Sequence, residues 1–272
     1  MQGSGGASVP KANKGLPEGV VWAKAICNVY VLRDPEGTYI IDTGMGKDAK
    51  NVLASLSSAG VRVQDLKGIL LTHQHPDHVG GAATIQKLSG APVAAHRMDA
   101  MAIEGKAARS GAAIARVLMH PVPVKVANVL EDGSTIGPFT TIYLPGHTPG
   151  SVAFYHKARS LLFTGDALIV SHAGRLCLSR SSYTYDPEGA AMSLGKLAGL
   201  SVSAIMPGHG SPITEGATEK LAEVVEKVTH PLPSPSPTLI GPEGRPEIHP
   251  GSPGWKEGQA FKWNNTRPPR SS

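Results

Sequence analysis

The sequence predicts an α/β fold in which two β-sheets pack face to face and helices cover their outer sides. Short apolar runs typical of buried strands recur in both halves of the chain, and in each half amphipathic segments follow them. The length of 272 residues and the apolar content of 40% are sufficient for one large domain with additional terminal segments. The expected architecture is therefore a four-layer αββα sandwich.

In the first half, strands are expected at residues 20–25, 28–33 and 38–42. The turn Asp34-Pro35-Glu36-Gly37 has Pro and Gly at their favoured positions, so the second and third strands should form a hairpin. A helix is expected at 47–59, where Val52 and Leu56 share one face and Gly60 ends the pattern. A strand at 68–71, a helix at 82–88 and a strand at 91–95 follow.

In the second half, strands are expected at residues 125–130, 139–144, 151–156, 161–164 and 203–206. Asp186 and Pro187 are suited to the N-cap and first position of a helix that runs to about residue 197. A last helix is expected at 214–228. The segment 97–120 interrupts the strands and predicts one or two helices. They are either a packing pair or a lid over the functional site, for which Met98 and Met101 would supply adaptable apolar surface.

Both ends differ in composition from the predicted domain at 20–229. Residues 1–19 are rich in Gly, Lys and Pro, which predicts a flexible N-terminal arm. Residues 230–272 form a Pro-rich C-terminal tail that cannot build a helix or a central strand. A disordered tail is one interpretation. Because Trp255, Phe261 and Trp263 lie in it, we also expect the tail to dock, either on its own domain or in a homodimer.

The composition excludes several classes of function. The net charge is only +5, and no basic run is interleaved with aromatic residues, so no nucleic-acid partner is expected. No stretch of eighteen apolar residues predicts a transmembrane helix, and no membrane partner is expected. Cys27 and Cys177 fit no metal or disulfide pattern, and the N-terminus does not resemble a signal peptide. These features favour a cytoplasmic protein that acts on a small molecule.

The strongest chemical signal is the stretch Leu-Leu-Thr-His-Gln-His-Pro-Asp-His-Val-Gly-Gly at residues 70–81. His73, His75, Asp77 and His78 fall within six residues of it, between a predicted strand and a helix. Imidazole and carboxylate suit a borderline divalent ion such as zinc. The two histidines at i and i+2 can converge from one extended segment, whereas Asp77 and His78 lie at the turn and can face a second ion.

This His-x-His-x-Asp-His run resembles the metal motif of the metallo-β-lactamase superfamily. The resemblance implies three further ligands downstream, a His, an Asp and a His. The chain supplies His147 in Pro-Gly-His-Thr-Pro-Gly, Asp166 in Thr-Gly-Asp-Ala and His209 in Pro-Gly-His-Gly, each after a short apolar strand. The resemblance extends over residues 20–229 and implies the metallo-β-lactamase sandwich as the fold.

The resemblance also implies a dinuclear site. His73, His75 and His147 would hold the first ion, Asp77, His78 and His209 the second, and Asp166 would bridge them. Two ions about 3.5–4 Å apart lower the pKa of the water between them and polarise a carbonyl. Asp77 would also act catalytically, by passing a proton to the leaving group. The expected cofactors are two divalent ions, zinc first, with iron or manganese as alternatives.

Four further residues have two interpretations each. Asp42 either hydrogen-bonds a ligand histidine or caps the following loop. His96 is a candidate eighth ligand, although the pattern implied by the resemblance is already complete. Tyr183 and Tyr185 follow Asp166 and could contact the substrate carbonyl, as a tyrosine does in the related acyl-homoserine lactonases; alternatively, they pack near the helix that begins after Asp186.

The expected activity is hydrolysis of a small ester, lactone or thioester. Glyoxalase II is similar in its metal motif. Antibiotic hydrolysis is expected at most as a promiscuous β-lactamase activity, because the true β-lactamases usually lack the bridging Asp. The alternative is a mononuclear iron persulfide dioxygenase. Those enzymes carry Gly-Arg-Thr-Asp-Phe after the bridging Asp, whereas here Leu176 and Cys177 follow Gly174-Arg175, which counts against this class.

Overall fold

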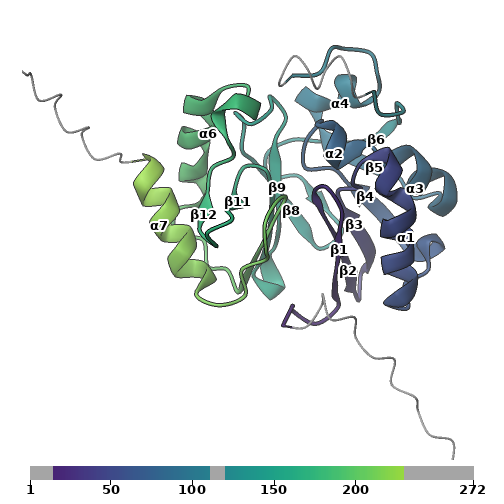
Figure 1. Ribbon diagram of the computed structural model, residues 1–272, viewed down its shortest axis with the longest axis horizontal. Helices are drawn as coiled ribbons and strands as arrows, with labels where there is room; N and C mark the ends of the chain where they lie inside the picture. The colour runs from purple at the N-terminus through teal and green to yellow at the C-terminus, as the bar shows by residue number, and fades with distance from the viewer. Residues whose placement is uncertain (1–14, 111–119, 230–272) are drawn as a thin grey trace, which may run out of the picture. The chain divides into compact units, whose positions relative to one another are not determined.

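The computed structural model describes residues 15–110 and 120–229 (Figure 1). The predictions for the tail at 230–272, for nearly all of the arm at 1–19 and for part of the segment 97–120 fall outside the described residues. The boundaries proposed for the arm, the domain and the tail therefore stay a prediction.

The first sheet contains six strands that follow one another in chain order. The first three pair antiparallel and the last four pair parallel. The hairpin predicted around Pro35 is confirmed. The last residue of its turn, Gly37, has a φ of +142°, a backbone conformation that favours glycine. The strands are β1 (Val20–Lys24), β2 (Asn28–Asp34), β3 (Gly37–Ile41), β4 (Leu66–Leu70), β5 (Val93–His96) and β6 (Val126–Leu130).

The second sheet has the strand order β13-β10-β9-β8-β7. Strand β10 is parallel to β13, and β8, β9 and β10 alternate in direction, so β8, β10 and β13 all end at the same edge. The strands are β7 (Thr135–Ile136), β8 (Phe139–Tyr143), β9 (Val152–His156), β10 (Leu161–Gly165) and β13 (Ala204–Pro207). A short ribbon of β11 (Ile169–Val170) and β12 (Leu176–Cys177) was not predicted, since neither strand exceeds two residues.

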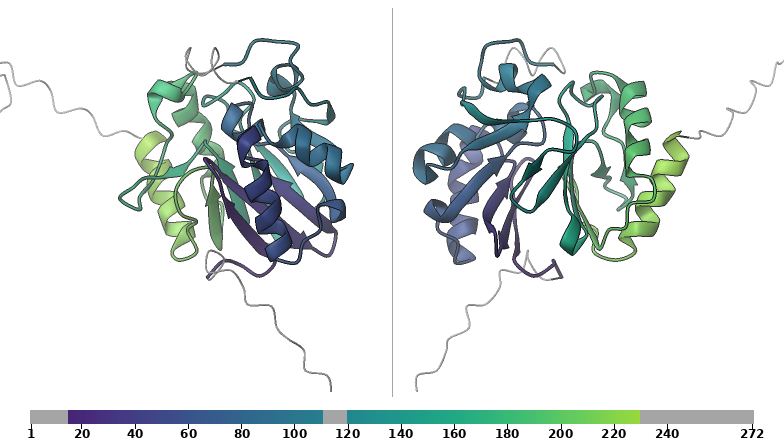
Figure 2. Two further views of the ribbon diagram at one scale, coloured as in Figure 1. Left: turned by 45° about the vertical axis from the view of Figure 1, so that its right-hand side comes forward. Right: turned by 180° about the vertical axis from the view of Figure 1, so that it is seen from behind.

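Helices cover the outer side of each sheet, and the predicted αββα order of layers is confirmed (Figures 1 and 2). The first sheet is covered by α1 (Ala49–Ser58), α3 (Ala82–Ser89) and α4 (Arg97–Ile103), and the second by α6 (Pro187–Ser193) and α7 (Ala217–Thr229). The short helix α2 (Pro76–Val79) lies in the loop after β4. None of the helices within residues 15–110 and 120–229 is long and apolar enough to cross a membrane.

Alternation along the strands builds three apolar cores. In β10, Leu161 and Phe163 face the first sheet, whereas Leu162 faces α7 and the 3-10 turn at Leu194–Leu197. Both faces of the strand are buried, which explains why its sequence is apolar throughout. Between the sheets, Tyr30 meets Phe163 edge-on at 5.6 Å, and Phe139 meets the same ring at 5.7 Å.

Three helical predictions differ in detail. The helix expected at 47–59 begins with a 3-10 turn at Gly46–Asp48, and the one expected to reach residue 197 ends in a 3-10 turn at Leu194–Leu197. Within 97–120, only α4 is regular helix among the described residues, and residues 104–110 form a turn, a bend and irregular chain. A sequence pattern fixes such ends to within only a few residues, because the final turns lack intrahelical partners.

Candidate metal centre

The seven predicted ligands converge where strands of both sheets end. His73 and His75 follow β4, and Asp77 and His78 lie on α2 directly after them. The remaining three come from the second sheet, with His147 after β8, Asp166 after β10 and His209 after β13. Since these three strands run in the same direction, the fold brings all the loops to one edge, where α/β proteins commonly bind ligands.

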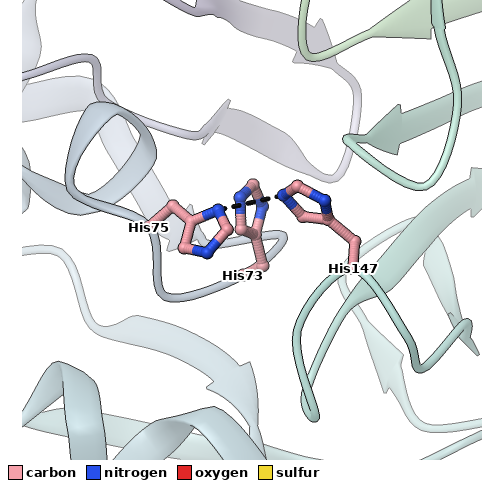
Figure 3. A group of neighbouring side chains, drawn as sticks. All are labelled: His73, His75 and His147. Carbon is pink, nitrogen blue, oxygen red and sulfur yellow. Dashed lines mark hydrogen bonds between the residues drawn. The ribbon is translucent and has the colours of Figure 1, made fainter. Parts of the chain in front are cut away.

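His73, His75 and His147 form the first group of potential ligands. One ring nitrogen of each lies within 4.8 Å of the others. His75 Nδ1 is 2.9 Å from His147 Nε2, and the three rings face a common space (Figure 3). His73 Nε2 is buried and has no hydrogen-bond partner. Such an arrangement of imidazole nitrogens fits one divalent cation.

Asp77, His78 and His209 form the second group, again within 4.8 Å. Asp77 Oδ2 lies 3.3 Å from His209 Nε2 and 3.7 Å from His78 Nε2. Asp166 stands between the two groups. Its Oδ2 is 3.5 Å from His147 Nε2 and 3.4 Å from His209 Nε2, and its Oδ1 is 3.4 Å from His78 Nε2. A carboxylate in this position can serve both groups at once.

Asp42 orients one ligand in each group. His78 Nδ1 donates to Asp42 Oδ2 at 2.7 Å, which leaves His78 Nε2 as the ligating atom. The Thr72 hydroxyl donates to the same oxygen at 2.8 Å, so it must accept from His73 Nδ1 at 3.0 Å, and His73 Nε2 is left free. Of the two interpretations of Asp42, the hydrogen bond is confirmed, and its partner is the predicted ligand His78. The backbone φ of Asp42 is +57°, a value that is rare for a non-glycine residue and is found most often at functional sites.

Hydrogen bonding also fixes the tautomer of His147. The Thr184 hydroxyl donates to the carbonyl of Arg180 at 2.9 Å, so it accepts from His147 Nδ1 at 3.3 Å. His147 Nε2 is then a lone pair that faces His75 and Asp166. His147 Nε2 accepts from His75 Nδ1 at 2.9 Å. By contrast, Nε2 of His73, Nε2 of His78 and Oδ1 of Asp166 are buried without a hydrogen-bond partner among the described residues. Buried polar atoms are rarely left unpaired, and the donor set present here fits two cations.

The electrostatics differ between the two groups. Burial lowers the pKa of His73 and His147, and neighbouring histidines lower it further in His73. Burial also lowers the pKa of His75, to about 3. For His78, burial opposes protonation, but Cys27, Asp42 and the other nearby acids outweigh it and raise the pKa. The three imidazoles of the first group are therefore neutral near pH 7, whereas the acidic side chains are concentrated around the second group.

Asp99 ties the two ligand loops together. Its buried carboxylate accepts hydrogen bonds from the backbone N–H and the side-chain amide of Gln74, both at 2.8 Å. It also accepts from the Thr148 hydroxyl at 2.7 Å and from the Gly150 N–H at 2.8 Å. Gln74 lies between His73 and His75, and Thr148 follows His147, so one carboxylate sets the distance between the two loops that carry the first group.

The first sheet also holds the loop of His209. The Asn28 side chain donates to the carbonyls of Pro207 at 2.9 Å and Gly210 at 2.6 Å, and the Tyr30 hydroxyl donates to Pro207 at 3.0 Å. The residue before His209 must be glycine, because a Cβ on Gly208 would lie 2.2 Å from Asp166 Oδ1. Sequence reasoning missed Asp99 and Asn28. Neither belongs to a motif, and only their contacts across the fold reveal them.

Five of the seven predicted ligands line a cavity of about 430 Å³, and we call this part of the lining its floor: His75, Asp77, His147, Asp166 and His209. Tyr183 lines this cavity and is 52% exposed, whereas Tyr185 lies outside the lining. Their roles stay a prediction.

His96 is not among the clustered ligands. Its ring stacks on Tyr143 at 4.1 Å, and its Nδ1 accepts from the Met98 N–H at the start of α4. The lining residues are Ile26, Met45, His75, Pro76, Asp77, Arg109, Ser110, His147, Asp166, Ile169, Ser179, Arg180, Tyr183 and His209.

Known proteins are similar to this chain in sequence and in fold. The probable metallo-hydrolase YflN of Bacillus subtilis is 29% identical over 217 residues, which is 70% of this chain and 82% of YflN. A hydroxyacylglutathione hydrolase of Ectopseudomonas mendocina is 32% identical over 175 residues, 63% of this chain but only 56% of that enzyme.

The solved structure of TTHA1623 in a di-iron-bound form is 30% identical, with a TM-score of 0.57 over 75% of this chain and 94% of that one. A metallo-β-lactamase of Cronobacter sakazakii, in a mutant form, shares the fold with a TM-score of 0.61 at 22% identity, over 76% of this chain and 91% of its own. The model of the metallo-β-lactamase superfamily matches residues 23–209. The chain therefore belongs to the metallo-β-lactamase superfamily, whose fold implies divalent metal binding, and it is a metallo-hydrolase.

Proposed function

We propose that this protein is a dinuclear metal-dependent hydrolase that cleaves a small ester, lactone or thioester. One observation carries the proposal. Side chains from both sheets bring two groups of ligand atoms together, with Asp166 between them, and several of these atoms are buried without a partner. A structural zinc site is closed and four-coordinate, and it needs neither a second group nor a bridging carboxylate.

His73, His75 and His147 would hold one ion, and Asp77, His78 and His209 the other, with Asp166 shared. When bound, two ions supply Lewis acidity toward a carbonyl and water of lowered pKa. The chain adds positioning and proton transfer. Asp77 lines the cavity and its side chain remains 26% exposed, so its carboxylate can accept a proton at the floor and release it to a leaving group. Tyr183 is the cavity residue suited to donate a hydrogen bond to the substrate carbonyl.

Zinc is the metal we favour, because neutral imidazole and carboxylate suit it. The same ligands accept iron or manganese, and one similar structure is described as di-iron-bound. Thioesters are included because the hydroxyacylglutathione hydrolases are among the similar proteins. The similarity covers little more than half of those enzymes, so a glutathione thioester is one candidate within the class.

The test combines metal analysis with a panel of substrates. Protein purified without added metal should contain close to two divalent ions per chain, and it should hydrolyse at least one of an aryl ester, a lactone and a thioester. Asp166→Ala should lose about one ion and most activity while the fold is retained. Near one iron per chain, with oxygen uptake on a persulfide and no hydrolysis, would replace the proposal by the dioxygenase class.

A further inference from the structure

The cavity carries more positive charge than its metal ligands require. Arg109 and Arg180 both line it, and neither forms an ion pair within residues 15–110 and 120–229. Among the described residues of the lining, the acids are Asp77 and Asp166, and both are assigned to the metal groups. We infer that Arg109 binds a carboxylate of the substrate. The inference rests on the proposed function and narrows it to esters, lactones or thioesters that carry an acid group.

Arg109 is held in place by the ligand loop itself. The N–H of Ser110 donates to Gln74 Oε1 at 3.1 Å, and Gln74 lies between two ligand histidines. The other side-chain atom of that amide, Nε2, donates to Asp99. Arg109 Nη2 donates to the carbonyl of Ala102 at 3.1 Å. The guanidinium is therefore tethered to α4, and the backbone of the next residue is tethered to the loop of the first metal group, so both contacts restrict where Arg109 lies relative to the metal groups. A preorganised group loses little freedom on binding.

Within the described part of the chain, the hydrogen-bonding capacity of Arg109 is largely unused. A guanidinium has five N–H donors, and the bond to Ala102 uses one of them. Nε is buried without a partner, as is the hydroxyl of its neighbour Ser110. Asp99, the acid whose charge acts on Arg109, already accepts four hydrogen bonds from other groups. A planar, two-oxygen anion can satisfy several guanidinium donors at once, which is the geometry that Arg prefers.

The rest of the cavity defines the substrate further. Ile26, Met45 and Ile169 provide apolar walls, and the metal ligands form the floor. The volume of about 430 Å³ is that of a small-molecule site. The molecule that matches has a carbonyl at the floor, an apolar middle and a carboxylate at Arg109. Arg180 is exposed, so solvent weakens its contribution to anion binding.

The experiment compares two esters that differ only in one charge, 4-nitrophenyl hydrogen adipate and its methyl ester. In the metal-loaded protein we expect kcat/KM to favour the acid. Arg109→Gln keeps an amide that can bond Ala102 but removes the charge. It should lower kcat/KM for the acid by about 10–100-fold, chiefly through KM, because a charge-assisted hydrogen bond is lost. The value for the methyl ester should change less than about threefold. Arg175→Gln removes an exposed charge outside the cavity lining and should not alter the preference.

An equal fall for both esters, or no change for either, would overturn the inference. A second measurement is independent of turnover. Calorimetry should show that monomethyl adipate binds the unchanged protein about tenfold more tightly than Arg109→Gln, whereas any binding to metal would be common to both proteins. Equal affinities would also overturn it. If the unchanged protein hydrolyses no ester, lactone or thioester, the hydrolase proposal fails, and the calorimetric difference still decides whether Arg109 binds carboxylate.

Discussion

Replacing Asp99 by Asn should loosen the first metal group more than the second. The aspartate accepts four hydrogen bonds, two on each oxygen, from the loops of His73 and His147. Asparagine has the same shape but only one acceptor oxygen. Its NH₂ is best placed toward Thr148, whose hydroxyl can rotate and accept. The backbone N–H of Gln74 then faces the NH₂ and becomes a buried donor without an acceptor.

The magnitude follows from these contacts. One orphaned buried N–H, together with the loss of charge assistance in the remaining bonds, costs about 2–4 kcal/mol of folding free energy. For a domain of this size, that lowers the melting temperature by about 5–15 °C. Partners that position metal ligands typically contribute about 10–100-fold in affinity, and we expect this loss for the ion at His73, His75 and His147.

Melting should be measured in the presence of a chelator, so that metal binding does not add to stability. Metal affinity should be measured by titration of the metal-free protein, because the two ions are then resolved by stoichiometry. Asp65→Asn is the matched control. It removes an exposed carboxylate that contacts only Arg62 among side chains of described residues, and it should leave both properties unchanged. An Asp99→Asn protein with unchanged melting temperature and unchanged affinity for both ions would refute the role of Asp99.

Gly208→Ala should displace the carboxylate of Asp166 and cost about 1–3 kcal/mol by overpacking, with loss of bound metal measured by elemental analysis. Gly195→Ala, whose added Cβ would have its nearest contact at 3.8 Å, is the control that should retain both ions. His96→Ala should leave metal content unchanged and lower stability by about 0.5–1.5 kcal/mol through the lost ring stacking, and loss of a whole ion would show that a ligand had been misassigned. Asp34 lies 2.9 Å from His156 across the two sheets, and although burial raises its pKa, the bonds from His156 and the Glu36 N–H lower it overall. The stabilisation by ionised Asp34 should be complete above pH about 4 and should be lost as the pH falls through the lowered pKa of Asp34. The difference in free energy of unfolding between the unchanged protein and Asp34→Asn should therefore shrink in acid. A difference that grows in acid would contradict this pH dependence.

The sequence alone predicted the layers of the fold and the side chains that cluster at the edge of the two sheets. Strand and helix periodicities are local, because they depend on which sides of one element are buried. The continuous apolar runs around Leu70 and Phe163 therefore indicated strands that are buried on both faces. The run from His73 to His78 places four ligand-capable groups within one loop, and no long-range information is needed to see it. The resemblance then identified His147, Asp166 and His209, which lie together in the structure.

The tertiary structure decided what surrounds those ligands. Asp99 meets Gly150 across 51 positions of the chain, and Asn28 meets Pro207 across 179. Such contacts depend on how two sheets stack and where their strands end, and no periodicity in the sequence encodes them. The packing of the two sheets also decides that Tyr183 lines the cavity and that Tyr185 does not, although the two residues are nearly adjacent in the chain. It also places Arg109, from an insertion whose sequence carries no motif, beside the floor of the site, because a hydrogen bond between Ser110 and Gln74 joins that insertion to the metal loop.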